Sequence, residues 1–146
     1  MIQKPSLRKK ARRYAVQGIY QWQLSGNAIE EIELQFLETM KHAKVDIPYF
    51  REILVNTLTQ AAALDELLKP LLDREFDEVN PVELSVLRLA CFELKDRVDI
   101  PYKVVINEAL ELSKTFGATD GHKFVNGILD KLATQLRPME KTHPSQ

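Results

Sequence analysis

Cationic side chains near the N-terminus are the first residues whose types and spacing could do chemistry. The first 29 positions contain no acidic residue and six basic ones, which are Lys4, Arg8, Lys9, Lys10, Arg12 and Arg13. Ammonium and guanidinium groups bind phosphate oxygens, so this segment indicates an anionic partner. Nucleic acid is favoured over a membrane surface because the segment lacks a strongly apolar face. The alternative interpretation is a terminus that only keeps the chain soluble.

A helix through this segment would sort its residues onto two faces. At about 100° per residue, the cations from Arg8 to Arg13 fall within an arc of about 200°. The other face carries residues suited to packing, which are Leu7, Ala11, Tyr14, Ala15, Gly18 and Trp22. We therefore expect an exposed basic arc, Arg12 included, that meets phosphates. Tyr20 would either extend the exposed side toward a partner or pack against the next helix.

The turn over residues 115–124 is a second candidate surface. Phe124 could stack on an unpaired base, Lys123 could neutralise a phosphate, and Asp120 could accept a hydrogen bond from a base edge. This mixture is typical of proteins that bind single-stranded RNA. Packing in the core is the competing role for Phe124.

No pattern in the sequence indicates catalysis or metal binding. The chain contains no glycine-rich phosphate loop, no GxSxG or HExxH motif and no pair of cysteines. Its three histidines, His42, His122 and His143, lack the spacing of metal ligands. Cys91 lies among apolar residues and is predicted to be a small core residue. We expect no catalytic residue, no metal and no cofactor.

Composition indicates one globular domain. The chain has 146 residues, of which 45% are apolar and 28% charged, with 5 Gly and 7 Pro. After the basic segment, 14 basic and 21 acidic residues remain, so the body of the protein is acidic. No apolar run reaches the roughly 18 residues of a membrane span, and no secretory signal is recognisable. These features predict a cytoplasmic protein that does not contact a membrane.

Apolar periodicity and capping residues predict six or seven helices and no strand. We expect one helix over 7–24, one capped by Asn27 and ending near Lys44, one from Asp46 to about Pro70, one beginning at Asn80, one from Pro101 to Gly117, and one capped by Asp120 that ends before Pro138. An all-α helical bundle follows. Glycine inside a helix costs about 1 kcal/mol relative to alanine, so Gly127 suggests the close approach of another helix.

Three segments carry a resemblance to a known family. They are Arg12–Tyr20, Pro101–Ala109 and Lys123–Lys131. Through them, and over nearly its whole length, the chain resembles the NusB family of transcription antitermination factors. The resemblance implies a single RNA-binding domain made of two packed three-helix subdomains. The implied bounds are 1–138 for the domain, about 1–72 and 80–138 for the subdomains, and 139–146 for a polar C-terminal tail.

The same resemblance implies a function in RNA binding. Such proteins bind the boxA element of nascent ribosomal RNA transcripts together with NusE, a ribosomal protein of the small subunit. They help to assemble the processive antitermination complex on RNA polymerase in the bacterial cytoplasm. Carried over position by position, the RNA contacts would be Arg8, Lys9, Lys10, Arg12, Arg13, Asp120, Lys123 and Phe124. Tyr20 and Glu83 would face NusE.

Two alternative functions are considered. A NusB-like domain also precedes the catalytic domain of certain RNA cytosine methyltransferases, and we expect 146 residues to leave no room for such a domain. A protein-only adaptor, whose basic helix binds an acidic partner, is the other alternative. RNA recognition predicts affinity that falls with salt and with scrambling of boxA, whereas an adaptor would be indifferent to RNA sequence. Whether the free protein forms a homodimer through the RNA surface stays open.

Overall fold

The fold is built from helices throughout residues 5–142, the part of the chain that the computed structural model describes. The all-α class is confirmed, with eight α-helices in this range instead of six or seven. They are α1 (Pro5–Ser25), α2 (Ile29–Thr39), α3 (Ile47–Thr59), α4 (Ala61–Leu68), α5 (Pro81–Asp96), α6 (Tyr102–Phe116), α7 (Gly121–Leu136) and α8 (Pro138–Thr142). Two 3-10 helices, η1 (Lys69–Leu71) and η2 (Phe76–Glu78), connect α4 to α5. Lys4 and His143 lie outside the described residues.

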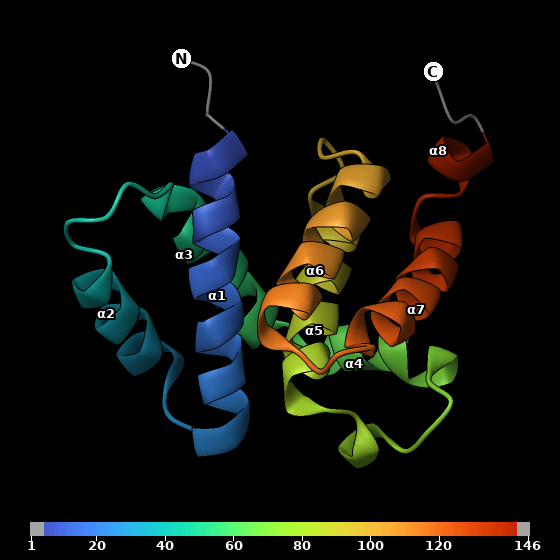
Figure 1. The fold of residues 1–146 in the computed structure, drawn as a ribbon, viewed down its shortest axis with the longest axis horizontal. Helices are drawn as coiled ribbons and strands as arrows, with labels where there is room; N and C mark the ends of the chain where they lie inside the picture. The colour runs from blue at the N-terminus through green and yellow to red at the C-terminus, as the bar shows by residue number, and fades with distance from the viewer. Residues whose placement is uncertain (1–4, 143–146) are drawn as a thin grey trace.

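The helices form two neighbouring groups. Helices α1, α2 and α3 lie on one side of the molecule, and α5, α6 and α7 lie on the other (Figure 1). Their buried apolar side chains form one cluster to which all of the helices from α1 to α7 contribute. The division into subdomains over 1–72 and 80–138 stays a prediction. No helix in the described range has the length and apolar composition needed to cross a membrane.

Helix α5 is the central element of the fold. Every residue from Ser85 to Leu94 is buried, because α1, α3, α4, α6 and α7 all pack against this helix. Its start is confirmed as predicted: the Val82 amide donates to the Asn80 side chain at 2.8 Å, and Pro81 is the first helical residue. The central position gives the acidic side chains of α5 contact with elements on both sides of the molecule.

Small residues let α1 lie close to its neighbours. Ala11, Ala15 and Gly18 are buried, as the helical pattern predicted. A methyl group at Gly18 would come within 2.9 Å of Leu54 Cδ1 on α3, so α1 and α3 are packed as tightly as glycine allows. Gly26 ends α1 with a φ of 71°, a left-handed conformation that favours glycine.

The ends of α2 and two of the predicted caps differ from the prediction. Helix α2 ends at Thr39 instead of near Lys44, and Asn27 does not cap it, because Ala28 is the N-cap and no side chain bonds there. Asp120 precedes α7 but likewise makes no capping bond. Gly117 after α6 has a φ of −96°, so it does not adopt the left-handed conformation of a typical glycine C-cap. The end of α6 at Phe116 and the start of α7 at Gly121 nevertheless lie where the sequence predicted them.

The helix expected from Asp46 to Pro70 is broken at Gln60 into α3 and α4. The Asp46 cap is confirmed, since its side chain accepts a hydrogen bond from the Tyr49 amide. The Gln60 amide group donates to Asp96 at 3.1 Å and accepts from Lys95 at 3.0 Å. The residue at the break therefore bonds the end of α5. The sequence around Gln60 does not reveal this contact.

Two positions near the C-terminus show features that the sequence pattern did not predict. The segment expected as a polar tail contains α8, which is held by Glu140: its carboxylate accepts from the Tyr102 amide at 2.8 Å and from Arg137 at 2.6 Å. The close approach expected at Gly127 is wrong, because no heavy atom outside its own helix lies within 4 Å of the position a Cβ would take.

Candidate nucleic-acid interface

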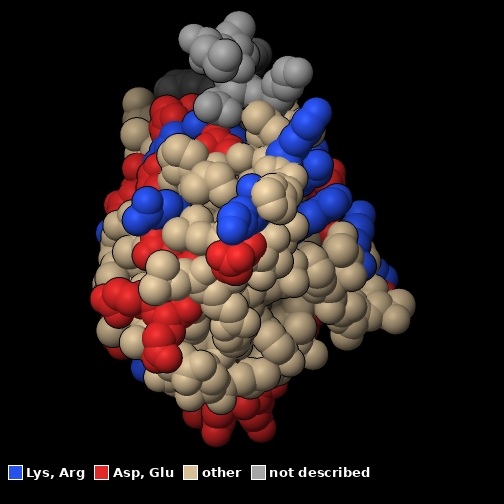
Figure 2. Space-filling model, turned by 90° about the vertical axis from the view of Figure 1, so that its left-hand side faces the viewer, with Lys and Arg blue, Asp and Glu red and all other residues tan. Residues whose placement is uncertain are grey.

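The basic segment of α1 is divided between the surface and the interior. Lys10 and Arg13 are exposed, whereas Arg8 and Lys9 are half-buried. Figure 2 shows Lys and Arg side chains over the upper half and right edge of one face, with Asp and Glu side chains among them as well as along the left edge and at the base. Lys10 and Arg13 can therefore meet a phosphate without any rearrangement of the protein.

Arg8 and Lys9 already have partners within the protein. The Arg8 guanidinium lies 4.3 Å from the centre of the Tyr49 ring and 3.7 Å from the Asp46 carboxylate. Lys9 donates to Glu108 at 2.6 Å and to Glu111 at 3.2 Å, both on α6. The hydrogen bond to Glu108 is the main reason that the pKa of Lys9 is raised. A phosphate that binds either cation would have to compete with these carboxylates.

Arg12 does not lie on the exposed arc, and the prediction that placed it there is wrong. The residue is only 4% exposed. Its Nε donates to both carboxylate oxygens of Glu93 on α5, at 3.1 and 3.2 Å, and its Nη2 donates to the Tyr49 hydroxyl at 3.3 Å. The Tyr49 hydroxyl in turn donates to Glu93. Arg12 therefore joins α1, α3 and α5, and no phosphate can reach its guanidinium while this network is intact.

The second candidate surface presents polar and aromatic groups at the start of α7. Asp120 and Lys123 are each 73% exposed and form an ion pair of 3.4 Å. Phe124 is half-buried and packs partly against the core, so both of its predicted roles are open to it. Its ring also meets Arg74, whose guanidinium lies 4.2 Å from the ring centre.

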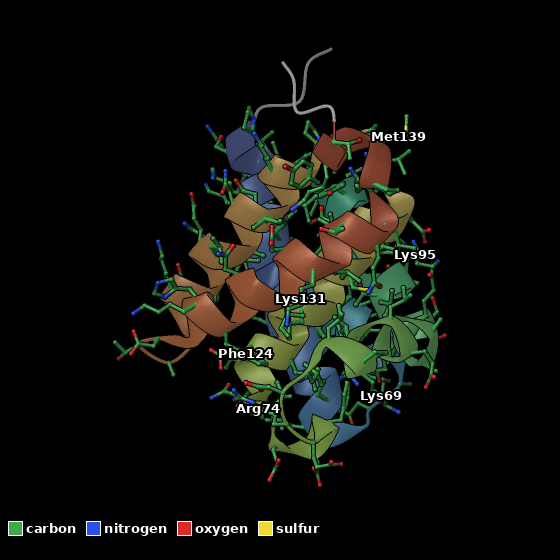
Figure 3. The ribbon with its side chains drawn as sticks, turned by 90° about the vertical axis from the view of Figure 1, so that its right-hand side faces the viewer. Lys69, Arg74, Lys95, Phe124, Lys131 and Met139 are labelled. Carbon is green, nitrogen blue, oxygen red and sulfur yellow. The ribbon has the colours of Figure 1, made fainter. Side chains whose placement is uncertain are left out.

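Arg74 is the residue at this surface that the sequence interpretation missed. It lies in the segment between η1 and η2, and Figure 3 shows it next to Phe124 at the lower edge of that face. It also bonds its neighbour Asp73, with Nε and Oδ1 2.7 Å apart. The segment mixes acidic and basic residues without a pattern, so only the packing of α7 against this part of the chain reveals the contact.

Glu83 does not present its carboxylate at the surface, contrary to its expected position facing NusE. The residue is 4% exposed and accepts a hydrogen bond from the Ala118 amide, 3.3 Å away in the turn between α6 and α7. Burial raises the pKa of Glu83, and this bond partly opposes the increase. Glu83 therefore belongs structurally to the turn that leads into Asp120, Lys123 and Phe124.

Tyr20 lies at an open, largely apolar groove. The residue is 37% exposed. The groove has a volume of about 550 Å³ and is lined by Val16, Gln17, Tyr20, Gln21, Leu24, Ser25, Phe36, Val82, Ser85 and Phe116. Leu24 and Phe116 are also exposed in this groove. Such a surface suits an apolar side chain of a protein partner better than a phosphate.

The two candidate surfaces meet where α1 passes the end of α6. Arg13 of α1 and Thr115 of α6 line one small hollow, together with Lys9, Glu108, Glu111 and Leu112. Thr115 is two residues before Gly117, where the turn toward α7 begins. The exposed cations of α1 and the turn over 117–124 can therefore be part of one continuous surface.

The described residues contain no cluster of metal ligands, and their cysteine is buried. Within residues 5–142, no group of three or more His, Cys, Asp or Glu side chains could hold a metal ion. Cys91 is fully buried, as predicted, and burial raises the pKa of its thiol to about 12. A thiol with this pKa remains protonated near neutral pH and is a poor nucleophile.

Sequence comparisons identify close relatives. The model of the NusB family matches residues 9–134. The transcription antitermination protein NusB of Shewanella amazonensis is 61% identical to this chain over 132 residues, which are 90% of this chain and 98% of that protein. The corresponding protein of Alcanivorax borkumensis is 56% identical over 136 residues, 93% of this chain and 91% of that protein.

Structural comparisons agree on the fold. The crystal structure of antitermination factors NusB and NusE in complex with dsRNA contains a chain that is similar with a TM-score of 0.82 at 24% identity. The match covers 90% of this chain and 99% of that one. T. maritima NusB is similar with a TM-score of 0.81 at 30% identity, covering 97% of this chain and 99% of that one.

Proposed function

The chain belongs to the NusB family of transcription antitermination proteins, and from this premise we propose that it binds boxA RNA together with NusE. The protein is an antitermination factor and not an enzyme. Its contribution is assembly: it holds a nascent ribosomal RNA transcript and a protein partner together, so that the antitermination complex forms on RNA polymerase in the bacterial cytoplasm.

The hollow that Arg13 of α1 shares with Thr115 of α6, between the two candidate surfaces, is the observation that carries the proposal. Exposed Lys10 and Arg13 would bind successive phosphates and supply attraction that does not depend on sequence. The turn beyond Thr115 would add base discrimination through Asp120 and Phe124. Lys123 would bind a phosphate once the RNA displaces its ion pair with Asp120.

NusE is assigned to the groove around Tyr20. The groove is mostly apolar and does not include the cations of α1, so a protein and an RNA strand could bind at the same time. Simultaneous binding to a shared complex raises the affinity of each partner without new contacts on this chain. In this arrangement NusE would add its own RNA contacts, and boxA affinity would be incomplete without it.

Charge reversal at the exposed cations tests the proposal. Labelled boxA RNA and a scrambled RNA are titrated by fluorescence anisotropy, with and without NusE, over a series of salt concentrations. The wild-type protein should prefer boxA and bind it more tightly when NusE is present. Lys10→Glu and Arg13→Glu should each weaken binding about tenfold and lower the slope of log affinity against log salt by about one.

A control comes from Lys95→Glu, which reverses an exposed cation at the end of α5 whose own contacts are with Gln60 and Asp96. Lys95 lies across the molecule from Phe124 (Figure 3), so this variant should bind as the wild type does. Equal, weak binding of both RNAs by the wild type would contradict the proposal and favour a protein-only adaptor. A Lys95→Glu variant as weak as Arg13→Glu would reduce the basic segment to a general polyanion site.

A further inference from the structure

The buried carboxylate of Glu83 lies beneath the turn between α6 and α7. Glu83 is at the start of α5, the helix that is surrounded on all sides, so its backbone is held firmly. Its carboxylate accepts the hydrogen bond of the Ala118 amide at 3.3 Å, across 35 positions of sequence. Burying a carboxylate costs free energy unless it has partners, and here the partner is the backbone of the turn.

Two glycines of the turn leave space for this carboxylate. A methyl group at Gly117 or at Gly121 would overlap Glu83 Oε2. Neither glycine has a positive φ, so the backbone conformation alone does not require glycine at either position. Space for Glu83 is the structural demand that both positions share. The turn and the carboxylate are therefore fitted to one another at three points, Gly117, Ala118 and Gly121.

The turn leads directly into the residues assigned to RNA. Asp120 lies between the contact points Ala118 and Gly121, and Lys123 and Phe124 are in the first turn of α7. Within the turn, the Gly121 amide donates to the Ala118 carbonyl at 3.0 Å and Asp120 pairs with Lys123, but the Asp120 side chain makes no capping bond with α7. The Glu83 carboxylate is itself too buried to touch RNA. Glu83 can therefore act on RNA only indirectly, either through the turn or through Arg74, whose charge partly opposes the rise that burial causes in the pKa of Glu83 and whose guanidinium contacts Phe124.

We propose that Glu83 is a positioning residue for RNA binding, whose carboxylate fixes the 117–121 turn so that Asp120, Lys123 and Phe124 face the RNA together. The inference deepens the proposed function and rests on it. A turn held in advance loses less conformational entropy when RNA binds. Without the carboxylate the turn would sample other conformations, and the RNA would have to select one of them.

Substitution of Glu83 separates positioning from charge. Glu83→Ala should weaken boxA binding about tenfold, as expected for the loss of one hydrogen bond to a charged group. In the same variant without RNA, the Ala118 amide should exchange its hydrogen about tenfold faster. Glu83→Gln keeps an oxygen acceptor in place and should restore most of both properties. Glu31→Ala, which removes an exposed carboxylate of α2, serves as the control and should change neither.

A double-mutant cycle tests whether the Glu83 carboxylate needs the space that Gly121 leaves. Gly121→Ala should weaken boxA binding in the wild-type background, because the added methyl group displaces the carboxylate. In the Glu83→Ala background the same change should have a much smaller effect, since the overlapping group is gone. If Glu83→Ala does not fold, Gly121→Ala and Glu83→Gln still decide the question: weaker binding in the first with near wild-type binding in the second supports positioning.

The outcomes are distinguishable from a failure of the proposed function. If the wild type shows no preference for boxA, the proposed function fails, while hydrogen exchange at Ala118 still reports whether Glu83 holds the turn. If the wild type prefers boxA but Glu83→Ala binds equally well or more tightly, the positioning role is overturned. The same conclusion follows if Gly121→Ala is equally harmful with and without Glu83.

Discussion

Arg12 and Arg13 are adjacent in the sequence and have opposite roles in the structure. Arg13 projects into solvent, whereas Arg12 is enclosed by Glu93 and Tyr49. A helix turns about 100° per residue, which is enough to carry one side chain from the surface to the interior. A count of basic residues therefore overstates how many are free to bind phosphate.

A substitution at Arg12 should test folding and not RNA contact. Arg12→Ala leaves the Glu93 carboxylate buried without its cation, and breaking a buried pair in this way typically costs about 3–5 kcal/mol of stability. We expect this loss in the free energy of unfolding measured by urea denaturation. Arg13→Ala, at an exposed position, should change it by less than about 0.5 kcal/mol. Equal urea midpoints for Arg12→Ala and the wild type would contradict the buried network.

The ring of Tyr49 contacts three arginine side chains. Two of them were predicted to bind RNA, and the third had no predicted role. The guanidinium groups of Arg8, Arg12 and Arg97 lie 4.3, 5.3 and 5.0 Å from the centre of its ring. These contacts connect the basic end of α1 with α3 and the end of α5. The first turns of α1 are therefore anchored as well as charged, which holds Lys10 and Arg13 in defined positions.

At the scale of elements, glycines within and after helices differ in what they do. Gly18 allows α1 and α3 to approach, and Gly26 provides a left-handed turn. Gly127 does neither, because it is exposed in α7 with open space around it. The sequence pattern predicted the close approach at Gly18 and wrongly predicted one at Gly127, since a helical glycine looks the same whether or not a neighbour is close.

Alanine substitutions should separate these roles. Gly127→Ala should stabilise the protein by up to about 1 kcal/mol, because alanine favours the helix and meets no neighbouring atom. Gly26→Ala should destabilise it, because the left-handed conformation strains any residue with a Cβ. Thermal unfolding followed by circular dichroism would show a higher midpoint for the first and a lower midpoint for the second. A lower midpoint for Gly127→Ala would show that the glycine serves something other than the isolated fold.

At the scale of the whole molecule, the two groups of helices share one core. Helix α5 packs against α1 and α3 in one group and against α6 and α7 in the other. The buried apolar side chains of both groups form one cluster. Neither group could bury its inner face without the other, so the two should not fold as separate units.

A shared core predicts one cooperative unfolding transition. Trp22 is the only tryptophan and lies on α1, so its fluorescence reports on the first group of helices. Far-UV circular dichroism reports on all helices. The two signals should give the same urea midpoint and the same slope. Separate transitions would instead show that the groups over 1–72 and 80–138 unfold independently.

The sequence by itself determined the properties that depend on local pattern. Apolar periodicity gave the all-α class, and the residues Asn80 and Pro81 gave the start of α5. The run of cations identified α1 as the basic element, and the small residues of its other face identified the side that packs. These properties are recorded in residues a few positions apart, where helix geometry alone relates one side chain to the next.

Only the tertiary structure decided which of the candidate residues are free. Arg12 is buried because it bonds Glu93, which is 81 positions away in the sequence. Glu83 is buried beneath the turn whose Ala118 amide it bonds, 35 positions away. Arg74, which lies in the connection between α4 and α5, likewise contacts the ring of Phe124 on α7, far away in the sequence. Partners so distant in sequence are chosen by how the helices pack, and one sequence carries no local signal for that choice. The basic helix was thus predictable as an element of the fold, and the partners of its individual side chains were not.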